Sequence, residues 1–180
     1  MFVIDDRYII DTIHKVDAGN LSKLMSSNYE RFYRYFPKTL EQNLSEKASK
    51  IFIEQKISEF DARSEFLFTL RDKENVIGLI YIKELDWSKK QGEFAYCIGA
   101  RYTGKGLISK SITLLSTYAF NNLGLEVLQI MVHKDNVPSV GVAKNGGFIW
   151  QKTISKSYSP PNEEPLDMEL YELYKNKDER

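Results

Sequence analysis

The feature that most constrains the fold is a glycine-containing segment, residues 99–107 (GARYTGKGL), placed between two segments of different periodicity. Residues 91–98 before it suit a strand, and residues 104–121 after it repeat apolar side chains at helical spacing. Glycines let the backbone turn tightly and approach a ligand closely. A helix that follows such a loop presents unpaired N–H groups and the positive end of its dipole. The sequence therefore predicts a strand–loop–helix unit that binds a phosphate group.

The remaining segments predict a mixed α+β domain. Segments with strand character are expected at residues 8–15, 65–70, 76–85, 91–98, 127–132, 148–157 and 166–174. Three of them follow one another closely, which favours an antiparallel meander. Helices are expected after Asp17 as N-cap, over residues 104–121, after Asn136, and from near Thr39 with an apolar face of Leu40, Leu44, Ala48 and Ile51. The charged tail, residues 175–180, is expected to be frayed.

Length and charge favour one globular domain that spans residues 1–180. Lys plus Arg number 25 and Asp plus Glu number 25, so we expect no general attraction to nucleic acid or to an anionic membrane. The longest apolar run, residues 76–82, is far shorter than the ~20 residues of a spanning helix. The N-terminus lacks a basic region followed by a long apolar run, and a single cysteine allows no intrachain disulfide. We therefore expect a cytoplasmic protein.

Two classes of phosphate ligand compete for the loop. Its first seven residues fit the P-loop of nucleotide triphosphatases, G-x-x-x-x-G-K, whose eighth residue is a magnesium-binding Ser or Thr. Here the eighth residue is Gly106. A P-loop also usually follows an early strand, and no convincing later strand ends in a magnesium-binding Asp. These departures disfavour a nucleotide triphosphatase.

The other interpretation also uses the residues around the loop. The pattern R-x-x-G-x-G at residues 101–106 resembles the R/Q-x-x-G-x-G/A loop of the GNAT superfamily of N-acetyltransferases. Residues 136–139 (NVPS) and 147–148 (GF) resemble the N-x-x-S … G-F signature of its Rim-type branch, the ribosomal-protein N-terminal acetyltransferases and their relatives. The resemblance covers residues 65–174 well and residues 8–60 in outline.

This resemblance implies both a fold and a cosubstrate. The fold is a central mixed, mostly antiparallel sheet, flanked by helices on both faces, with a V-shaped split between parallel strands that end at Ile98 and Val132. Acetyl-coenzyme A would enter the split, its pantetheine arm beside strand backbone and its pyrophosphate on the loop amides. The residues implied in binding it are Cys97, Ile98, Arg101, Thr103, Gly104, Lys105, Gly106, Leu107, Asn136 and Ser139.

The implied reaction is direct attack of a primary amine on the thioester, with no metal. Glu93 is the candidate base, although a solvated strand residue there would need no function. Many GNAT enzymes carry a Tyr as general acid four residues beyond the position of Ser139, but here that residue is Ala143, which shifts the acid role to Ser139. Cys97 lies in a strand and is expected to be a small buried hydrophobe rather than a nucleophile. Two histidines and one cysteine make no convincing zinc site.

The acceptor stays open at this stage. A protein N-terminus, a polyamine, an amino sugar or an antibiotic could supply the amine, and residues 25–40 and 155–166, which would build its site, match no pattern. The aromatic residues at 29–36 are expected to pack the first helices rather than to line that site. Because position 143 lacks the usual Tyr, a second hypothesis stays open, namely that the protein is a non-catalytic acyl-coenzyme A sensor. The expected partner is a small-molecule amine or a protein N-terminus, with no nucleic acid and no membrane, and the protein is expected to be a monomer or a homodimer.

Overall fold

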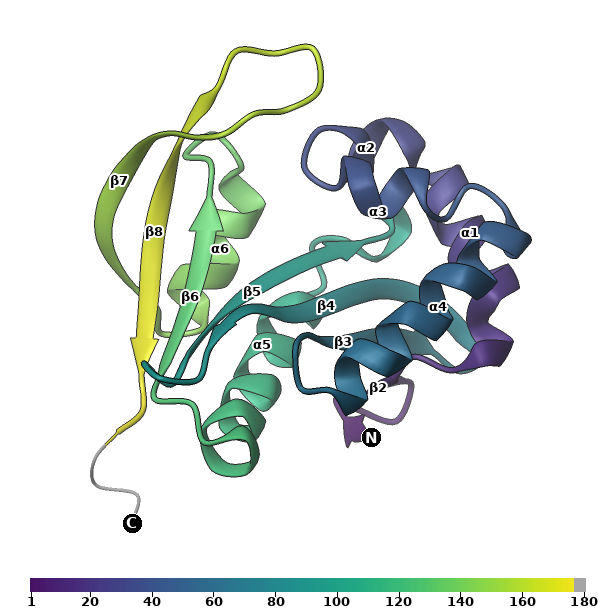
Figure 1. The fold of residues 1–180 in the computed structure, drawn as a ribbon, viewed down its shortest axis with the longest axis horizontal. Helices are drawn as coiled ribbons and strands as arrows, with labels where there is room; N and C mark the ends of the chain where they lie inside the picture. Colours follow the sequence, from purple (N-terminus) through teal and green to yellow (C-terminus); the bar gives the residue numbers. More distant parts are fainter. Residues whose placement is uncertain (177–180) are drawn as a thin grey trace.

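The computed structural model describes residues 1–176, which form one eight-stranded sheet with helices on both faces (Figure 1). The strand order is β1-β2-β3-β4-β5-β6-β8-β7, and every neighbouring pair is antiparallel except β5 and β6, which run parallel. The predicted mixed sheet and its central meander are thus confirmed. The strands are β1 (Phe2–Val3), β2 (Tyr8–Thr12), β3 (Phe66–Asp72), β4 (Asn75–Asp86), β5 (Gln91–Ile98), β6 (Val127–Val132), β7 (Ile149–Tyr158) and β8 (Leu166–Tyr174).

Each face of the sheet has its own apolar core. On one face, Leu21 of the first helix and Phe52 of the fourth pack with Leu79 of β4. On the other face, Ile112 and Leu115 pack with strand side chains such as Phe68, so the predicted apolar face of this helix is confirmed. The helices are α1 (Ala18–Ser27), α2 (Tyr29–Tyr33), α3 (Pro37–Glu41), α4 (Glu46–Asp61), α5 (Leu107–Tyr118) and α6 (Val137–Asn145), with short helical turns at Lys15–Asp17, Ala100–Tyr102 and Ala119–Leu123.

The sheet splits between its two parallel strands. β5 and β6 pair from Gln91 with Val127 to Phe94 with Ile130, and beyond these residues the two strands have no further pairing. The last four residues of β5 instead stay with β4, where Gly78 pairs with Ile98. The V-shaped opening predicted for this point of the fold is therefore present. It exposes backbone N–H and C=O groups that would be hydrogen-bonded between neighbouring strands in a regular sheet.

The prediction of one long helix from Thr39 was wrong. The structure has two helices, α3 and α4, and the Ser45 hydroxyl caps the second by accepting a hydrogen bond from the Ala48 amide at 3.2 Å. The cap restarts the helix, so Leu44 lies before it and is exposed, as is Ile51. The buried face of α4 carries Ser49, Phe52 and Ile53 instead.

The prediction of a frayed C-terminal tail was wrong for Lys175. The amide of Lys175 donates to the Glu126 carbonyl at 2.9 Å, and its ammonium donates to the Phe120 carbonyl at 3.0 Å. Lys175 is therefore fixed against the helical turn Ala119–Leu123, whereas residues 177–180 of the predicted tail lie outside the described residues.

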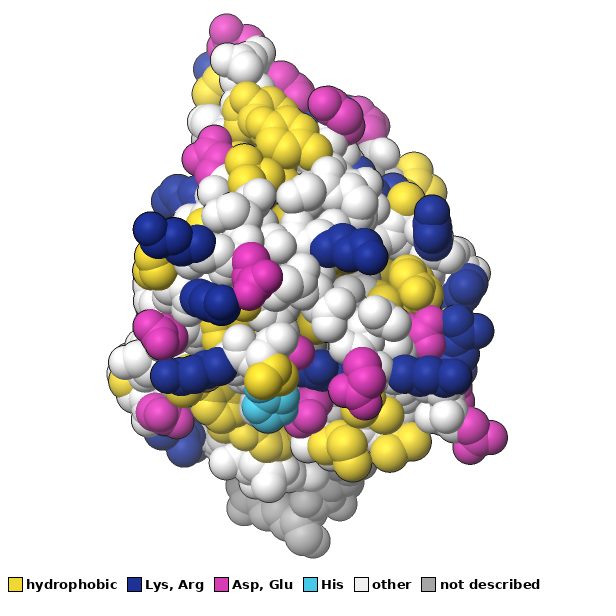
Figure 2. Space-filling view, turned by 90° about the vertical axis from the view of Figure 1, so that its right-hand side faces the viewer, with side chains coloured by type: hydrophobic (Ala, Val, Ile, Leu, Met, Phe, Trp, Pro, Cys, Tyr) yellow, Lys and Arg dark blue, Asp and Glu magenta, His cyan; other side chains and the backbone are white. Residues whose placement is uncertain are grey.

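The surface on the side of α1 mixes charges of both signs. Figure 2 shows Lys and Arg side chains interspersed with Asp and Glu over this face, without a large patch of one sign. Within residues 1–176 no helix is long and apolar enough to cross a membrane.

Asp17 has a different role from the predicted helix cap. Its side chain makes no cap hydrogen bond to α1 and instead forms a buried ion pair with Arg71, with hydrogen bonds of 2.9 and 2.5 Å. Both side chains are less than a tenth exposed. The carboxylate also accepts a hydrogen bond from the His14 amide at 2.7 Å. The pair ties the start of α1 to β3.

We expect Asp17→Asn to lower the free energy of unfolding by about 3–5 kcal/mol, because it leaves the buried Arg71 guanidinium without a counter-charge. The control is Glu54→Gln, which breaks the exposed ion pair to Lys15 and should cost less than about 1 kcal/mol. Urea unfolding of the three proteins measures both effects. Equal losses in the two variants would contradict a structural role for the buried pair.

Candidate active site

The glycine loop between β5 and α5 is open to solvent. Gly104 and Gly106 have φ angles of 74° and 71°, a region that suits glycine, and a Cβ at either position would meet no atom within 4 Å. Gly106 directly precedes α5, whose first amides have no partner within the helix. The loop therefore presents backbone donors to an unfilled space.

A cavity of about 550 Å³ lies against this loop and extends into the split of the sheet. Arg101 does not line it and is exposed, and the Lys105 ammonium instead lies 5.2 Å from the centre of the Tyr102 ring. The other residues predicted to bind the cofactor line this cavity together: Cys97, Ile98, Thr103, Gly104, Gly106, Leu107, Asn136 and Ser139.

The backbone of β5 borders the cavity within the split. The Gly99 amide donates to the Ile77 carbonyl of β4 at 2.8 Å. Because backbone groups of a strand alternate in direction, those of Tyr96 and Ile98 face away from β4, on the side where β6 has diverged. The Ile98 carbonyl accepts a hydrogen bond from the Arg31 side chain at 3.3 Å. An extended ligand in the split would meet strand-like donors and acceptors there.

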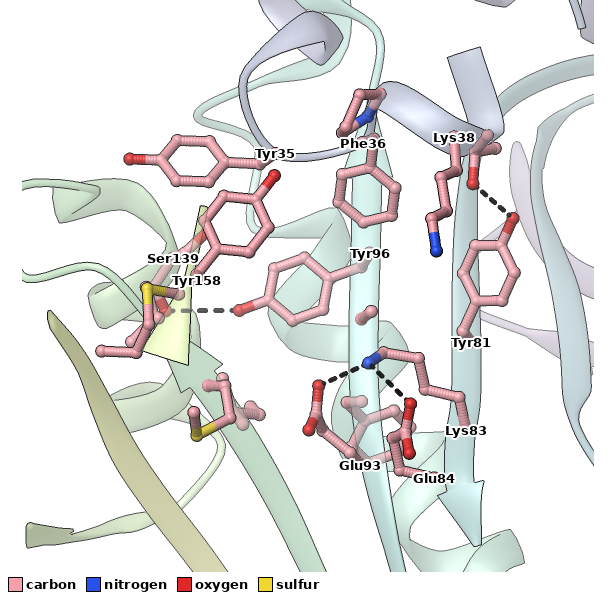
Figure 3. A pocket seen from close by; sticks show the side chains of 18 of the residues that line it. Tyr35, Phe36, Lys38, Tyr81, Lys83, Glu84, Glu93, Tyr96, Ser139 and Tyr158 are labelled. Atoms are coloured by element: carbon pink, nitrogen blue, oxygen red, sulfur yellow. Dashed lines mark hydrogen bonds and ion pairs between the residues drawn. The ribbon is translucent and has the colours of Figure 1, made fainter. Parts of the chain in front are cut away.

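A second cavity, of about 730 Å³, is lined by residues of both parted strands, β5 and β6 (Figure 3). Glu93 lines it, and its carboxylate pairs with the Lys83 ammonium at 2.8 Å. Lys83 also lies 3.9 Å from the carboxylate of Glu84. This cavity is the larger of the two, and the ion pair fixes the orientation of Glu93 within it.

The two cavities meet at a common set of side chains. Tyr96 and Ser139 lie at this junction, and the Tyr96 hydroxyl donates to the Ser139 carbonyl at 3.3 Å (Figure 3). The Ser139 hydroxyl makes no hydrogen bond within residues 1–176. The residues that line both cavities are Tyr35, Phe36, Tyr96, Asn136 and Ser139. A molecule bound in one cavity would therefore contact a molecule bound in the other at this shared set of residues.

The sequence interpretation missed Tyr96. Burial raises the pKa of its hydroxyl above the ordinary value for tyrosine, so it stays a neutral hydrogen-bond donor. Its position two residues before Ile98 is the signal that could have found it, because alternate residues of a strand share one face. Ala143, by contrast, is fully buried and lines neither cavity.

The connection between β7 and β8 extends toward α2 (Figure 1). The Tyr158 hydroxyl donates to the Arg34 carbonyl at 2.6 Å, and the Arg34 guanidinium pairs with Glu163 at 2.7 Å. The rings of Tyr35 and Tyr158 stack with centroids 6.0 Å apart. The expectation that the aromatic segment packs the helices therefore holds for the buried Phe32, whereas Tyr35 and Phe36 line both cavities.

Cys97 is expected to be chemically inert. Burial raises the pKa of its thiol to about 12, so the reactive thiolate is absent at neutral pH. We expect iodoacetamide at pH 8 to leave the native protein unmodified and to alkylate it in urea, as followed by mass spectrometry. In the direct transfer that the resemblance implies, no covalent step requires the thiol, so we expect Cys97→Ala to keep the turnover of the wild type. Rapid alkylation of the folded protein would contradict this description.

The chain is similar in sequence to acetyltransferases. Residues 7–149 match the family model described as acetyltransferase (GNAT) domain. An uncharacterized N-acetyltransferase, p20 of Bacillus licheniformis, is 23% identical over 112 residues, which are 62% of each protein. Spermidine N(1)-acetyltransferase of Escherichia coli strain K12 is 29% identical over 86 residues, 48% of this chain and 46% of that protein. The matched segments thus span less than two thirds of these relatives.

Solved structures of similar shape cover nearly the whole chain. The ribosomal-protein-S5-alanine acetyltransferase of Vibrio fischeri superposes with a TM-score of 0.91 at 18% identity, over 100% of this chain and 99% of that one. RimL, a ribosomal L7/L12 alpha-N-protein acetyltransferase in complex with coenzyme A, has a TM-score of 0.89 at 14% identity, over 96% and 97% of the two chains. At these identities the likeness establishes the fold.

Proposed function

Because the chain belongs to the GNAT acetyltransferase domain family, we propose that it is an enzyme that transfers an acetyl group from acetyl-coenzyme A to a primary amine. The observation that carries this proposal is the junction of the two cavities beside Tyr96 and Ser139. One cavity borders the glycine loop and the split, and the other holds a carboxylate, Glu93, that can take a proton. Two substrates that fill them would meet end to end.

The residues present fit the cosubstrate. The open amides at Gly104, Gly106 and Leu107 suit a pyrophosphate, because they leave unfilled space at a helix N-terminus. The backbone of Tyr96 and Ile98 suits the amide groups of a pantetheine arm, which would take the place of the missing β6 pairing. Arg101 and Lys105 would act through charge at the rim rather than inside the cavity.

The chemistry assigned to the site is direct transfer. The incoming ammonium gives up a proton to Glu93, directly or through water, and an α-amino group with a pKa of ~8 requires only a modest base. The amine nitrogen then bonds to the acetyl carbon, and the carbon–sulfur bond breaks. The backbone N–H near Ile98 is the donor for the developing oxyanion. The nitrogen loses its second proton to the departing thiolate, and the Ser139 hydroxyl at the junction is the group available to relay that proton or to donate a hydrogen bond to the thiolate.

Relatives support an amine as the acceptor. Their names include a spermidine acetyltransferase and acetyltransferases of ribosomal proteins, and both kinds of acceptor offer a primary amine. The alternative is a non-catalytic acyl-coenzyme A sensor, which the alanine at position 143 leaves open.

Thiol release separates the two functions. We expect acetyl-coenzyme A to raise the melting temperature far more than magnesium with adenosine triphosphate, since a ligand bound only by the native state stabilises it. With a panel of amines and peptides, an enzyme releases free coenzyme A thiol together with the acetylated amine. Stabilisation by acetyl-coenzyme A without thiol release for any acceptor would show a sensor, and stabilisation by the triphosphate alone would overturn both.

A further inference from the structure

Three lysines and three glutamates line the larger cavity, but they are not paired one to one. Glu93 and Glu84 share the Lys83 ammonium at 2.8 and 3.9 Å, and Glu65 pairs with the Lys56 ammonium at 2.5 Å. Every carboxylate that lines the cavity within residues 1–176 therefore already has a lysine beside it.

Lys38 is the exception among the lysines of this cavity. It has no ion pair or hydrogen bond to any of residues 1–176 through its side chain, although it lines the cavity. Figure 3 shows the side chain directed along the cavity between Phe36 and Tyr81. Its helix, α3, is fixed there because the hydroxyls of Thr39 and Tyr81 are hydrogen-bonded at 3.2 Å. The cavity thus offers an exposed cation, carried on a fixed helix, that has no ion-pair partner among residues 1–176.

From this unmatched cation we infer that the amine acceptor also carries an anionic group, such as a carboxylate, and that Lys38 binds it. The inference rests on the proposed function, because it names the class of acceptor for the same site. An amino acid and an acidic peptide N-terminus share this chemistry. The acetylated amine would lie toward Glu93 and the junction, and the anion would lie toward α3.

The same charges disfavour a polyamine. Each further ammonium of a polyamine needs an anion or an aromatic face, and each lining carboxylate already lies within 4 Å of a lysine ammonium, with Glu84 and Glu93 sharing that of Lys83. The face of Tyr35 is not free either, because the Arg34 guanidinium lies 5.3 Å from its ring centre. A polycation would also be repelled by Lys38, whereas an anion replaces part of its hydration with a charge-assisted hydrogen bond.

Matched acceptors test the inference. The probes are two peptides that differ only in Asp or Asn at the second residue, aspartate α-amide with asparagine amide as free compounds, and spermidine. For the wild type we expect kcat/KM to favour the carboxylate member of a pair roughly tenfold, the size of one hydrogen bond to a charged group. The pair that shows the preference, peptide or free compound, identifies the source of the anion.

The variants assign the preference to one side chain. Lys38→Met should remove it, Lys38→Arg should retain most of it, and Lys47→Met, at an exposed lysine of α4 outside the cavity, should leave it unchanged. Spermidine as the best acceptor, or a preference that survives Lys38→Met, overturns the inference while transfer to amines still stands. Acetyl-coenzyme A bound without thiol release for every probe overturns the proposed function and the inference with it.

Discussion

Gly106→Val is expected to weaken acetyl-coenzyme A binding by at least about 100-fold, as measured by calorimetry. The branched side chain would fill the space above the loop amides, where the pyrophosphate is proposed to lie. Loss of one or two hydrogen bonds to a charged group, each about 1.5–3 kcal/mol, gives an effect of this size. The φ angle of 71° adds backbone strain for a β-branched residue.

Gly124→Val is the matched control for that strain. Gly124 has a φ of 79°, a Cβ there would also meet no atom within 4 Å, and it lies at the other end of the helical segment. Both variants should lose a similar amount of stability, about 1–3 kcal/mol. Only Gly106→Val should lose affinity. Equal affinities of the two variants for acetyl-coenzyme A would show that the loop is not part of the binding site.

Ser139→Ala is expected to lower kcat by roughly 100-fold, at the low end of typical acid–base contributions. The change removes the hydroxyl proposed to supply a proton or a hydrogen bond to the departing thiolate, but it keeps the backbone carbonyl that accepts the hydrogen bond from Tyr96. Affinity for acetyl-coenzyme A should change only a few-fold. Steady-state kinetics and calorimetry on the same preparation separate the two quantities.

Ser159→Ala serves as the control, because Ser159 lines the larger cavity away from the junction. It should alter kcat by less than about twofold. If Ser139→Ala keeps full turnover, the hydroxyl is not the donor. Tyr96→Phe then tests the other hydroxyl at the junction, which burial keeps neutral.

Most of the fold was predictable because its signals are local. The strands at 91–98, 127–132 and 166–174 match the predicted bounds, since each is an apolar or alternating segment with turn residues beside it. Gly124 ends the helical segment in a left-handed conformation, as its position predicts. The error at residues 39–61 arose because apolar spacing continues through the Ser45 cap, so periodicity alone cannot show where one helix ends and the next begins.

The site was predictable only in part. The glycine loop is one local motif, so its residues could be named from their spacing, and the structure brings most of them to one cavity. The junction depends on contacts between distant segments, because Tyr96 meets Ser139 across 43 residues. The charge balance of the larger cavity depends likewise on which lysine each carboxylate reaches. Lys38 becomes distinctive only once the pairs of Lys56 and Lys83 are known.

Initial rates against both substrates, combined with the mass of the protein held with acetyl-coenzyme A alone, test the central claim of direct transfer most directly. The account predicts intersecting rate patterns, an unmodified protein mass, and one thiol released for each acetylated amine. A ping-pong pattern, with an acetyl group on Cys97 that passes to the amine product, would contradict it.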